Sequence, residues 1–168
     1  MTVSIAGETF VSGHRPSLKE KLFFLLSGIV SSVPLTLFVS QFASSLLSSL
    51  SLFYAVLLAT VVFSPFVEEF AKAFPLLYRH GETERSIFTL GFFVGFGFGF
   101  AEFLLYVFVL GVPFVFWLGG IVFHAASTSI IAYGIATRRA ATFYLISVVL
   151  HFANNFFALV FSMADLPA

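Results

Sequence analysis

Long apolar runs separated by short polar segments dominate the chain, and their lengths predict membrane-spanning helices. Five runs are long enough: residues 22–42, 50–78, 87–110, 113–137 and 140–163. A helix needs about 20 apolar residues to cross a hydrocarbon core about 30 Å thick. The pattern therefore predicts an all-α, polytopic membrane helix bundle of about five transmembrane helices over residues 22–163, preceded by a polar N-terminal tail over residues 1–21.

The second run is unusually long and contains the pair Ser64-Pro65. At 1.5 Å per residue, a helix over this whole run would extend about 44 Å, which exceeds the hydrocarbon core. Proline removes a backbone donor and disturbs the turn that precedes it. We therefore expect one long helix that is kinked at Pro65.

Basic residues outside the second run alternate between the connecting segments. They lie in the N-terminal tail, in the loop after the second run and in the turn after the fourth, at Arg15, Lys19, Lys21, Arg79, Arg85, Arg138 and Arg139. The other connections and the C-terminal tail contain no Lys or Arg. Because cytoplasmic loops are enriched in Lys and Arg, this alternation predicts a cytoplasmic N-terminus and an external C-terminus.

Composition agrees with an integral membrane protein. The chain is 60% hydrophobic and 10% charged, with a mean hydropathy of +1.06. Its formal net charge of zero gives no reason to expect nucleic acid as a partner. It contains no cysteine, which excludes disulfides, a thiolate metal site and a cysteine nucleophile. The 26 phenylalanines are interpreted as lipid-facing bulk.

Six ionisable side chains lie inside the apolar runs, at Glu68, Glu69, Lys72, Glu102, His124 and His151. A charge at mid-bilayer costs about 2.5–3.5 kcal/mol on insertion scales, so such residues usually face a shared interior and serve a function. Counting residues along each helix from the nearest basic loop gives the depth of each polar group. On four separate helices this depth is at or near the middle of the membrane. This convergence predicts one buried site.

The first of these helices carries the motif Glu68-Glu69-Phe70-Ala71-Lys72. Adjacent side chains on a helix point about 100° apart, so one carboxylate can take part in chemistry while a partner holds the other. Lys72 lies within ion-pair reach of either carboxylate.

The other site residues lie on three further helices. Glu102 follows glycines at i, i+4 and i+8, namely Gly91, Gly95 and Gly99, which form a flat face for close helix packing. His124 and His151 each have a polar residue at i+4 on the same helix face, and these supporting residues are Thr128 and Asn155. One intramembrane histidine often makes only an interhelical hydrogen bond, but two beside buried glutamates favour a functional site.

Several hydrolase motifs are missing. The chain has no His-Glu-x-x-His and no Gly-x-Ser-x-Gly, and no Asp lies inside an apolar run. A hydrolase of this sequence would therefore depend on glutamate and histidine.

At these residues the chain resembles the PrsW family of membrane proteases, which belongs to a larger group with the CAAX prenyl endopeptidases and the bacterial CAAX-like proteases. The similarity covers about residues 60–157: Glu-Glu-x-x-Lys, a glutamate in a Gly/Phe-rich helix, a histidine, and a second histidine followed by Asn. Lys72 and Glu102 distinguish it from the CAAX-like branch, which carries Arg and His there.

The resemblance implies an intramembrane protease of the cytoplasmic membrane of a prokaryote. Its substrate would be a membrane protein, in bacteria typically an anti-sigma factor. The residues matching the family motifs, and so expected to be catalytic, are Glu68, Glu69, Glu102, His124 and His151. The same superfamily includes a scaffold subunit of gamma-secretase, so the fold alone does not establish catalysis.

Three functions remain open at this point. In an endopeptidase, one glutamate of the pair activates water, while the imidazoles stabilise the oxyanion or bind a metal. A set of Glu69, His124 and His151 would suit zinc, although no spacing proves a metal. The alternatives are a proton-coupled transporter and a non-catalytic scaffold. The sequence leaves open a homo-oligomer and which of Glu68 and Glu69 is catalytic.

Overall fold

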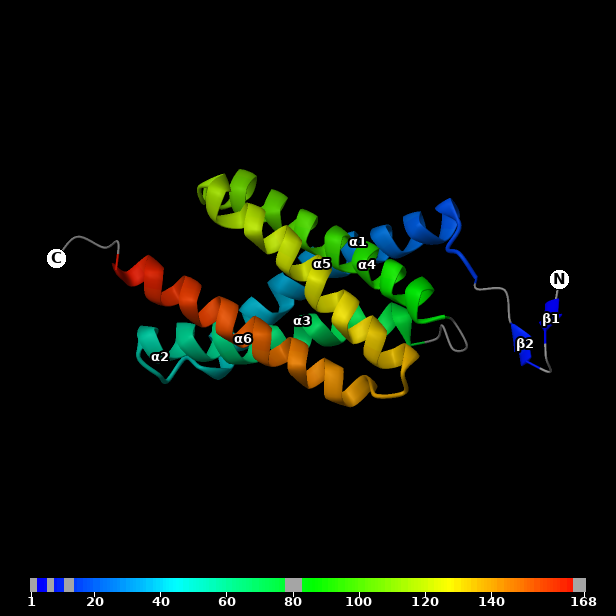
Figure 1. Ribbon diagram of the computed structural model, residues 1–168. Helices are drawn as coiled ribbons and strands as arrows, with labels where there is room; N and C mark the ends of the chain where they lie inside the picture. Colours follow the sequence, from blue (N-terminus) through cyan, green and yellow to red (C-terminus); the bar gives the residue numbers. More distant parts are fainter. Residues whose placement is uncertain (1–2, 6–7, 11–13, 78–82, 165–168) are drawn as a thin grey trace.

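The computed structural model describes residues 3–5, 8–10, 14–77 and 83–164. Five helices are long and apolar enough to cross a membrane: Leu18–Ala43, Leu52–Leu76, Glu84–Val109, Trp117–Ala136 and Ala140–Phe161. The chain folds as a bundle of these helices, with the termini at opposite ends (Figure 1). The prediction of a polytopic helical membrane protein with five spans is thereby confirmed.

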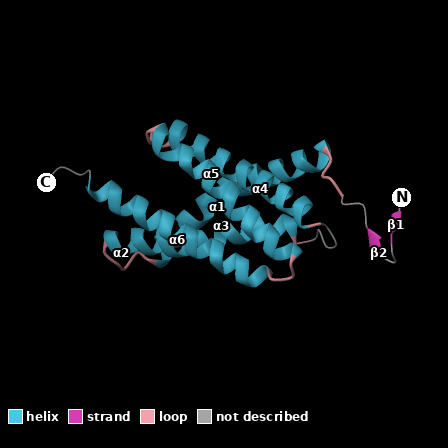
Figure 2. Cartoon of the chain, in the orientation of Figure 1, coloured by secondary structure: helices cyan, strands magenta, loops and turns pink. Residues whose placement is uncertain are grey.

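The N-terminal segment contains structure that the sequence pattern did not predict. Strands β1 (Val3–Ile5) and β2 (Glu8–Phe10) pair antiparallel in a short hairpin outside the bundle (Figure 2). Helix α1 (Leu18–Leu46) begins before the apolar run itself because Ser17 and Glu20 form a capping box. The Glu20 carboxylate accepts from the Ser17 backbone N–H at 2.7 Å, and the Ser17 hydroxyl accepts from the Glu20 N–H at 3.3 Å.

The second span changes helix type along its length. It consists of α2 (Leu52–Val56), the π-helix η1 (Leu57–Phe63), α3 (Ser64–Ala73) and the 3-10 turn η2 (Phe74–Leu76). In η1 the Ser64 N–H donates to the Ala59 carbonyl, five residues earlier. In this π-helical pattern the N–H of residue 65 would donate to the carbonyl of residue 60. Pro65 has no N–H, so the Thr60 carbonyl lacks that backbone donor. The interruption expected at Pro65 thus takes the form of a π-helical segment just before it.

The remaining helices pack against one side of the second span, and Phe66, Phe70 and Phe74 are exposed on its other side. Helix α4 (Glu84–Leu104) continues into the π-helix η3 (Leu105–Val109), followed by α5 (Phe114–Ala136) and α6 (Ala140–Ala164). Helix α4 packs against α1 and α5, and α3 contacts α1, α4, α5 and α6. Side chains on α3 can therefore meet those of every other long helix.

The tightest core lies toward the end of the bundle where α1 begins and α5 ends. Its residues are apolar and almost fully buried: Phe24, Leu76, Ile87, Leu90, Val94 and Ala132. Helices α4 and α5 approach closely through the predicted glycine face, since a methyl group at Gly95 would overlap the carbonyl of His124. This packing fixes the backbone of His124 against α4.

Candidate active site

The six ionisable side chains of the apolar runs converge on one buried cluster. They come from α3, α4, α5 and α6, and none is more than 4% exposed. The convergence expected from their depths is therefore present in the structure. A buried charge needs a partner, so the hydrogen bonds of the cluster decide what each residue can do.

Glu69 is the fixed negative centre of the cluster. One of its carboxylate oxygens, Oε1, lies 2.6 Å from Lys72 Nζ, 2.8 Å from His151 Nδ1 and 3.4 Å from the Ser127 hydroxyl. Glu69 and Lys72 are fully buried, and removing either would leave a charge without its partner. Because three donors hold Oε1, Glu69 orients these neighbours, while its other oxygen, Oε2, is buried without a hydrogen-bond partner among the described residues.

A second set of contacts connects Lys72 to α4 and α1 through His124. Lys72 Nζ lies 2.7 Å from His124 Nδ1, and His124 Nε2 lies 2.8 Å from Glu102 Oε2. The Thr36 hydroxyl donates to the other oxygen of Glu102 at 3.2 Å. An ammonium group can only donate, so Nδ1 of His124 accepts and Nε2 carries the proton given to Glu102. His124 is thereby held as one neutral tautomer.

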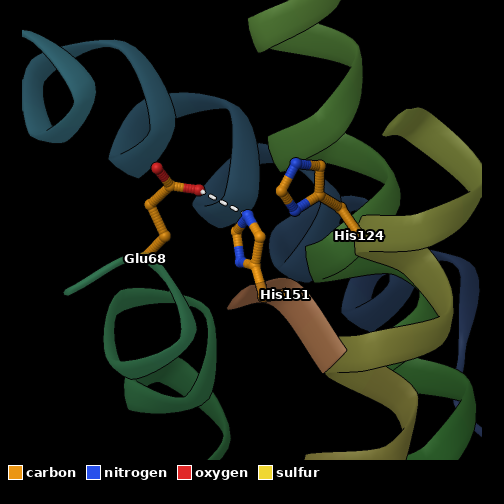
Figure 3. Close-up of side chains that lie close together, drawn as sticks. All are labelled: Glu68, His124 and His151. Carbon is orange, nitrogen blue, oxygen red and sulfur yellow. Dashed lines mark ion pairs between the residues drawn. The ribbon is translucent and has the colours of Figure 1, made fainter. Parts of the chain in front are cut away.

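His151 and Glu68 face each other across a gap. In the neutral imidazole of His151, donation of the Nδ1–H to Glu69 leaves a lone pair on Nε2. This Nε2 lies 3.7 Å from Glu68 Oε2 (Figure 3), which is too far for a direct hydrogen bond. The other oxygen of Glu68 accepts a hydrogen bond from the Ser64 hydroxyl. Two hydrogen-bond acceptors therefore point into the same space.

The neighbouring glutamates thus have different environments, as their angular separation on a helix allows. Glu69 is bonded to Lys72 and His151, whereas Glu68 is bonded to Ser64 and has one oxygen directed toward His151. Such a cluster can position a water molecule or a cation between Glu68 and the imidazoles.

A comparison with protein families matches residues 17–166 to the model described as the PrsW family intramembrane metalloprotease. The chain belongs to the PrsW family. The match covers nearly the whole chain, and so extends beyond the motifs of residues 60–157 to include α1. No curated protein matches the chain, and no solved structure matches it. This PrsW family protein is an integral membrane protein that carries an intramembrane protease domain.

Three side chains of the candidate site could hold a metal ion. Glu68, His124 and His151 each offer one ligand atom, and these atoms lie within 4.8 Å of one another. Two imidazoles and a carboxylate form a common ligand set of catalytic zinc, which binds them at about 2.0–2.2 Å. The sequence predicted Glu69 as the carboxylate ligand, but the structure places Glu68 in this group. The Glu69 carboxylate instead contacts Lys72 and His151 Nδ1.

The histidines differ in how readily they fit a metal. His151 has a free Nε2 and a carboxylate behind its Nδ1, the arrangement usual for metal-bound histidine. His124 uses both nitrogens, toward Lys72 and Glu102. It would have to give up one contact to bind a metal. The donor types fit zinc, and binding would require this change at His124 and a closer approach of the three ligand atoms.

The two residues predicted to support the site, Thr128 and Asn155, contact backbone carbonyls near it. The Thr128 hydroxyl donates to the backbone carbonyl of His124 at 2.9 Å, and the Asn155 amide donates to the Thr60 carbonyl at 2.9 Å. Of the loop histidines, His14 lies 3.2 Å from Glu20 near the start of α1, and His80 lies outside the described residues.

Sequence reasoning missed three hydroxyl groups that contact the carboxylates, those of Thr36, Ser64 and Ser127. Ser64 precedes Glu68 by one helical turn, so its position was a usable signal. Ser127 and Thr36 had no comparable signal, because their contacts depend on how different helices pack.

Proposed function

We propose that this PrsW family protein hydrolyses a peptide bond of a membrane-protein substrate with a water molecule held between Glu68 and His151. The observation that carries the proposal is the 3.7 Å separation of Glu68 Oε2 and His151 Nε2. Both atoms accept hydrogen bonds, and a bridging water can donate one hydrogen to each. The lone pairs of that water then remain free to attack a carbonyl carbon.

Glu68 is the general base in this proposal. It takes a proton from the attacking water and passes it to the amide nitrogen that leaves. Glu69 holds the Nδ1–H of His151, which keeps the Nε2 lone pair on the water, much as a third residue orients the base in other hydrolases. Lys72 and Glu102 hold His124 in one orientation beside this pair.

A zinc ion is the alternative to a water held directly by Glu68 and His151. Bound by Glu68, His124 and His151, it would use the same lone pairs, polarise the substrate carbonyl and make its own bound water more acidic. Measuring the zinc content of purified wild-type protein and of His151→Ala tests this part of the proposal. Zinc in the wild type and its loss from the variant would favour the zinc form, and a wild type without zinc would favour the water held directly by Glu68 and His151. Equal zinc content in both would remove His151 from the ligand set.

We further propose a substrate of the anti-sigma-factor type in a prokaryotic cytoplasmic membrane. The support is the position of the site within five membrane-spanning helices and the family to which the chain belongs. A bond inside or beside a membrane-spanning segment is the kind that such a site can reach.

The test is cleavage of a single-span membrane protein by the purified protein. Glu68→Gln and His151→Ala should each lower the rate by at least about 10²-fold, the usual contribution of a positioned acid–base group. Ser129→Ala is the matched control, because its buried hydroxyl bonds only the Ala125 carbonyl of its own helix. Wild-type cleavage by folded Glu68→Gln and His151→Ala would overturn the assignment of the water to these two residues, whereas no cleavage by the wild type would favour a scaffold.

A further inference from the structure

A cavity of about 520 Å³ lies between the second half of α1 and the irregular start of the second span. Its wall includes Thr36 from α1, Ala55 from α2, Ala59 and Thr60 from η1, and Tyr106 from η3. It also includes residues near the α1–α2 connection, such as Leu50. The cavity therefore extends from that connection into the bundle.

The cavity adjoins the candidate active site directly. Thr36 and Ser64 both line it, and their hydroxyls bond Glu102 and Glu68 respectively. On the other side of the site, the apolar core that includes Phe24 and Leu76 fills the bundle. The cluster thus lies between a packed end of the bundle and the cavity, and the Thr36 and Ser64 hydroxyls separate the cavity from the carboxylates of Glu102 and Glu68.

We propose that this cavity is the substrate subsite, and that it holds a short, unwound, uncharged stretch of the substrate chain next to the scissile bond. The assignment rests on the proposed function. It adds the side from which the substrate enters, namely the end of the bundle with the α1–α2 connection. The alternation of basic loops predicts that this end is external.

The volume limits what the cavity can hold. One turn of a helix, about 5.4 Å long and 10–12 Å wide, occupies roughly 400–600 Å³. The cavity is therefore about the size of a single helical turn, and a continuous transmembrane helix would extend outside it. A few residues in an extended conformation do fit, and unwinding also exposes the peptide carbonyl that the water must attack.

The lining suits an unwound backbone. In hydrocarbon, peptide groups that leave a helix need protein or water partners. The cavity supplies hydroxyl groups from Thr36, Ser48, Thr60, Ser64 and Tyr106. Hydroxyls that already donate to a carboxylate or carbonyl still accept a hydrogen bond. In the described part of the chain, the lining contains no Asp, Glu, Lys or Arg, so it offers a charged substrate side chain no partner.

The absence of cysteine makes a labelling test direct. Ala59→Cys places a thiol in the cavity wall, while Ser49→Cys places one on the exposed surface of the same connection, outside the lining. Glu84→Cys marks the opposite end of the bundle. Each variant is treated with a charged, membrane-impermeant methanethiosulfonate on intact cells and on inverted vesicles, and cleavage is then measured.

We expect Ala59→Cys and Ser49→Cys to react from one side and Glu84→Cys from the other. Modification should lower cleavage by Ala59→Cys at least about tenfold, because a group in the subsite displaces the substrate. Modified Ser49→Cys should keep its rate. Labelling of Ala59→Cys from the side of Glu84, or an unchanged rate after its complete modification, would overturn the assignment.

A second arm separates this proposal from the proposed chemistry. In the Glu68→Gln background, an uncleaved single-span substrate should slow labelling of Ala59→Cys but not of Ser49→Cys. Equal labelling rates with and without substrate would reject the subsite, even if Glu68 proves to be the base. Protection together with wild-type cleavage by Glu68→Gln would keep the subsite and reject the base.

Discussion

Helices α4 and α5 hold their part of the site through close backbone packing, whereas the second span is held by side chains from α6. A methyl group at Gly95 would overlap the carbonyl of His124, and one at Gly99 would lie 2.8 Å from Ile121 Cα. By contrast, η1 and α3 receive hydrogen bonds from Asn155 to the Thr60 carbonyl and from Tyr144 to the Phe66 carbonyl, at 2.9 and 2.8 Å.

This difference corresponds to two requirements of a catalytic site, fixed orientation of some groups and space for a substrate beside others. The His124–Glu102 pair lies where glycine packing leaves little room for movement. Glu68 lies on the span that departs from α-helical geometry and borders the cavity. We call α4 and α5 the close-packed half of the site, and η1 and α3 the irregular half. The close-packed half can fix the orientation of groups that must not move, while the irregular half leaves space for a substrate beside the base.

Lys72 connects the two halves, so its removal should have the largest effect. Lys72→Met would leave the Glu69 carboxylate without its buried cation and His124 Nδ1 without its donor. We expect a loss of about 3–5 kcal/mol of stability, as for other broken buried ion pairs, together with loss of cleavage. Thermal unfolding in detergent and the cleavage rate measure the two effects.

The double variant Lys72→Met with Glu69→Gln is the control for this effect. It removes both charges and should recover part of the stability, but not activity, because His151 would still lack its carboxylate. If the double variant is no more stable than Lys72→Met alone, the two charges do not act as a pair.

Gly95 tests the close-packed half. Gly95→Ala should push α4 away from His124, with a cost of about 1–3 kcal/mol for overpacking. A shift of about 1 Å at His124 would lower cleavage by roughly 10²-fold. Gly119→Ala on α5 is the matched control, since a methyl group there meets open space. Identical cleavage by the two variants would show that the close packing at Gly95 does not position the site.

The sequence predicted the close-packed half better than the irregular one. Apolar runs determine the number of spans, and glycines at i, i+4 and i+8 identify the packing face of α4 from local spacing alone. The π-helical form of η1 was not predicted. Its exposed carbonyl at Thr60 is satisfied by Asn155, from a helix far along the chain, and local patterns do not contain such a contact.

The site was predicted in its residue types and depth but not in its orientation. Counting residues from the basic loops locates Glu68 and Glu69 along the membrane normal. It does not show how far the helix is rotated about its axis. That rotation decides which carboxylate meets Lys72 and which faces His151, and it results from the packing of α3 against four other helices.

Asn155 tests the irregular half, with an effect that should be the smallest of the three. Asn155→Leu removes the side-chain donor to the Thr60 carbonyl, and because Thr60 is exposed we expect a cost of about 0.5–1.5 kcal/mol, the net contribution of one hydrogen bond. Because η1 leads directly to Glu68, we expect cleavage to fall by roughly tenfold. The structural cause is Pro65, which lacks the N–H that would serve Thr60 in the π-helical pattern.

Adding Pro65→Ala to Asn155→Leu distinguishes a positioning role from a direct one. The new backbone N–H at position 65 can donate to the Thr60 carbonyl, so the double variant should regain part of the stability and of the cleavage rate lost in Asn155→Leu. Pro65→Ala alone should change cleavage little, because Asn155 still serves the carbonyl. If Asn155 instead contacts the substrate, the proline substitution cannot restore its function. Cleavage by the double variant as low as that of Asn155→Leu would therefore reject the positioning role, whereas recovery would show that Asn155 acts through the shape of η1.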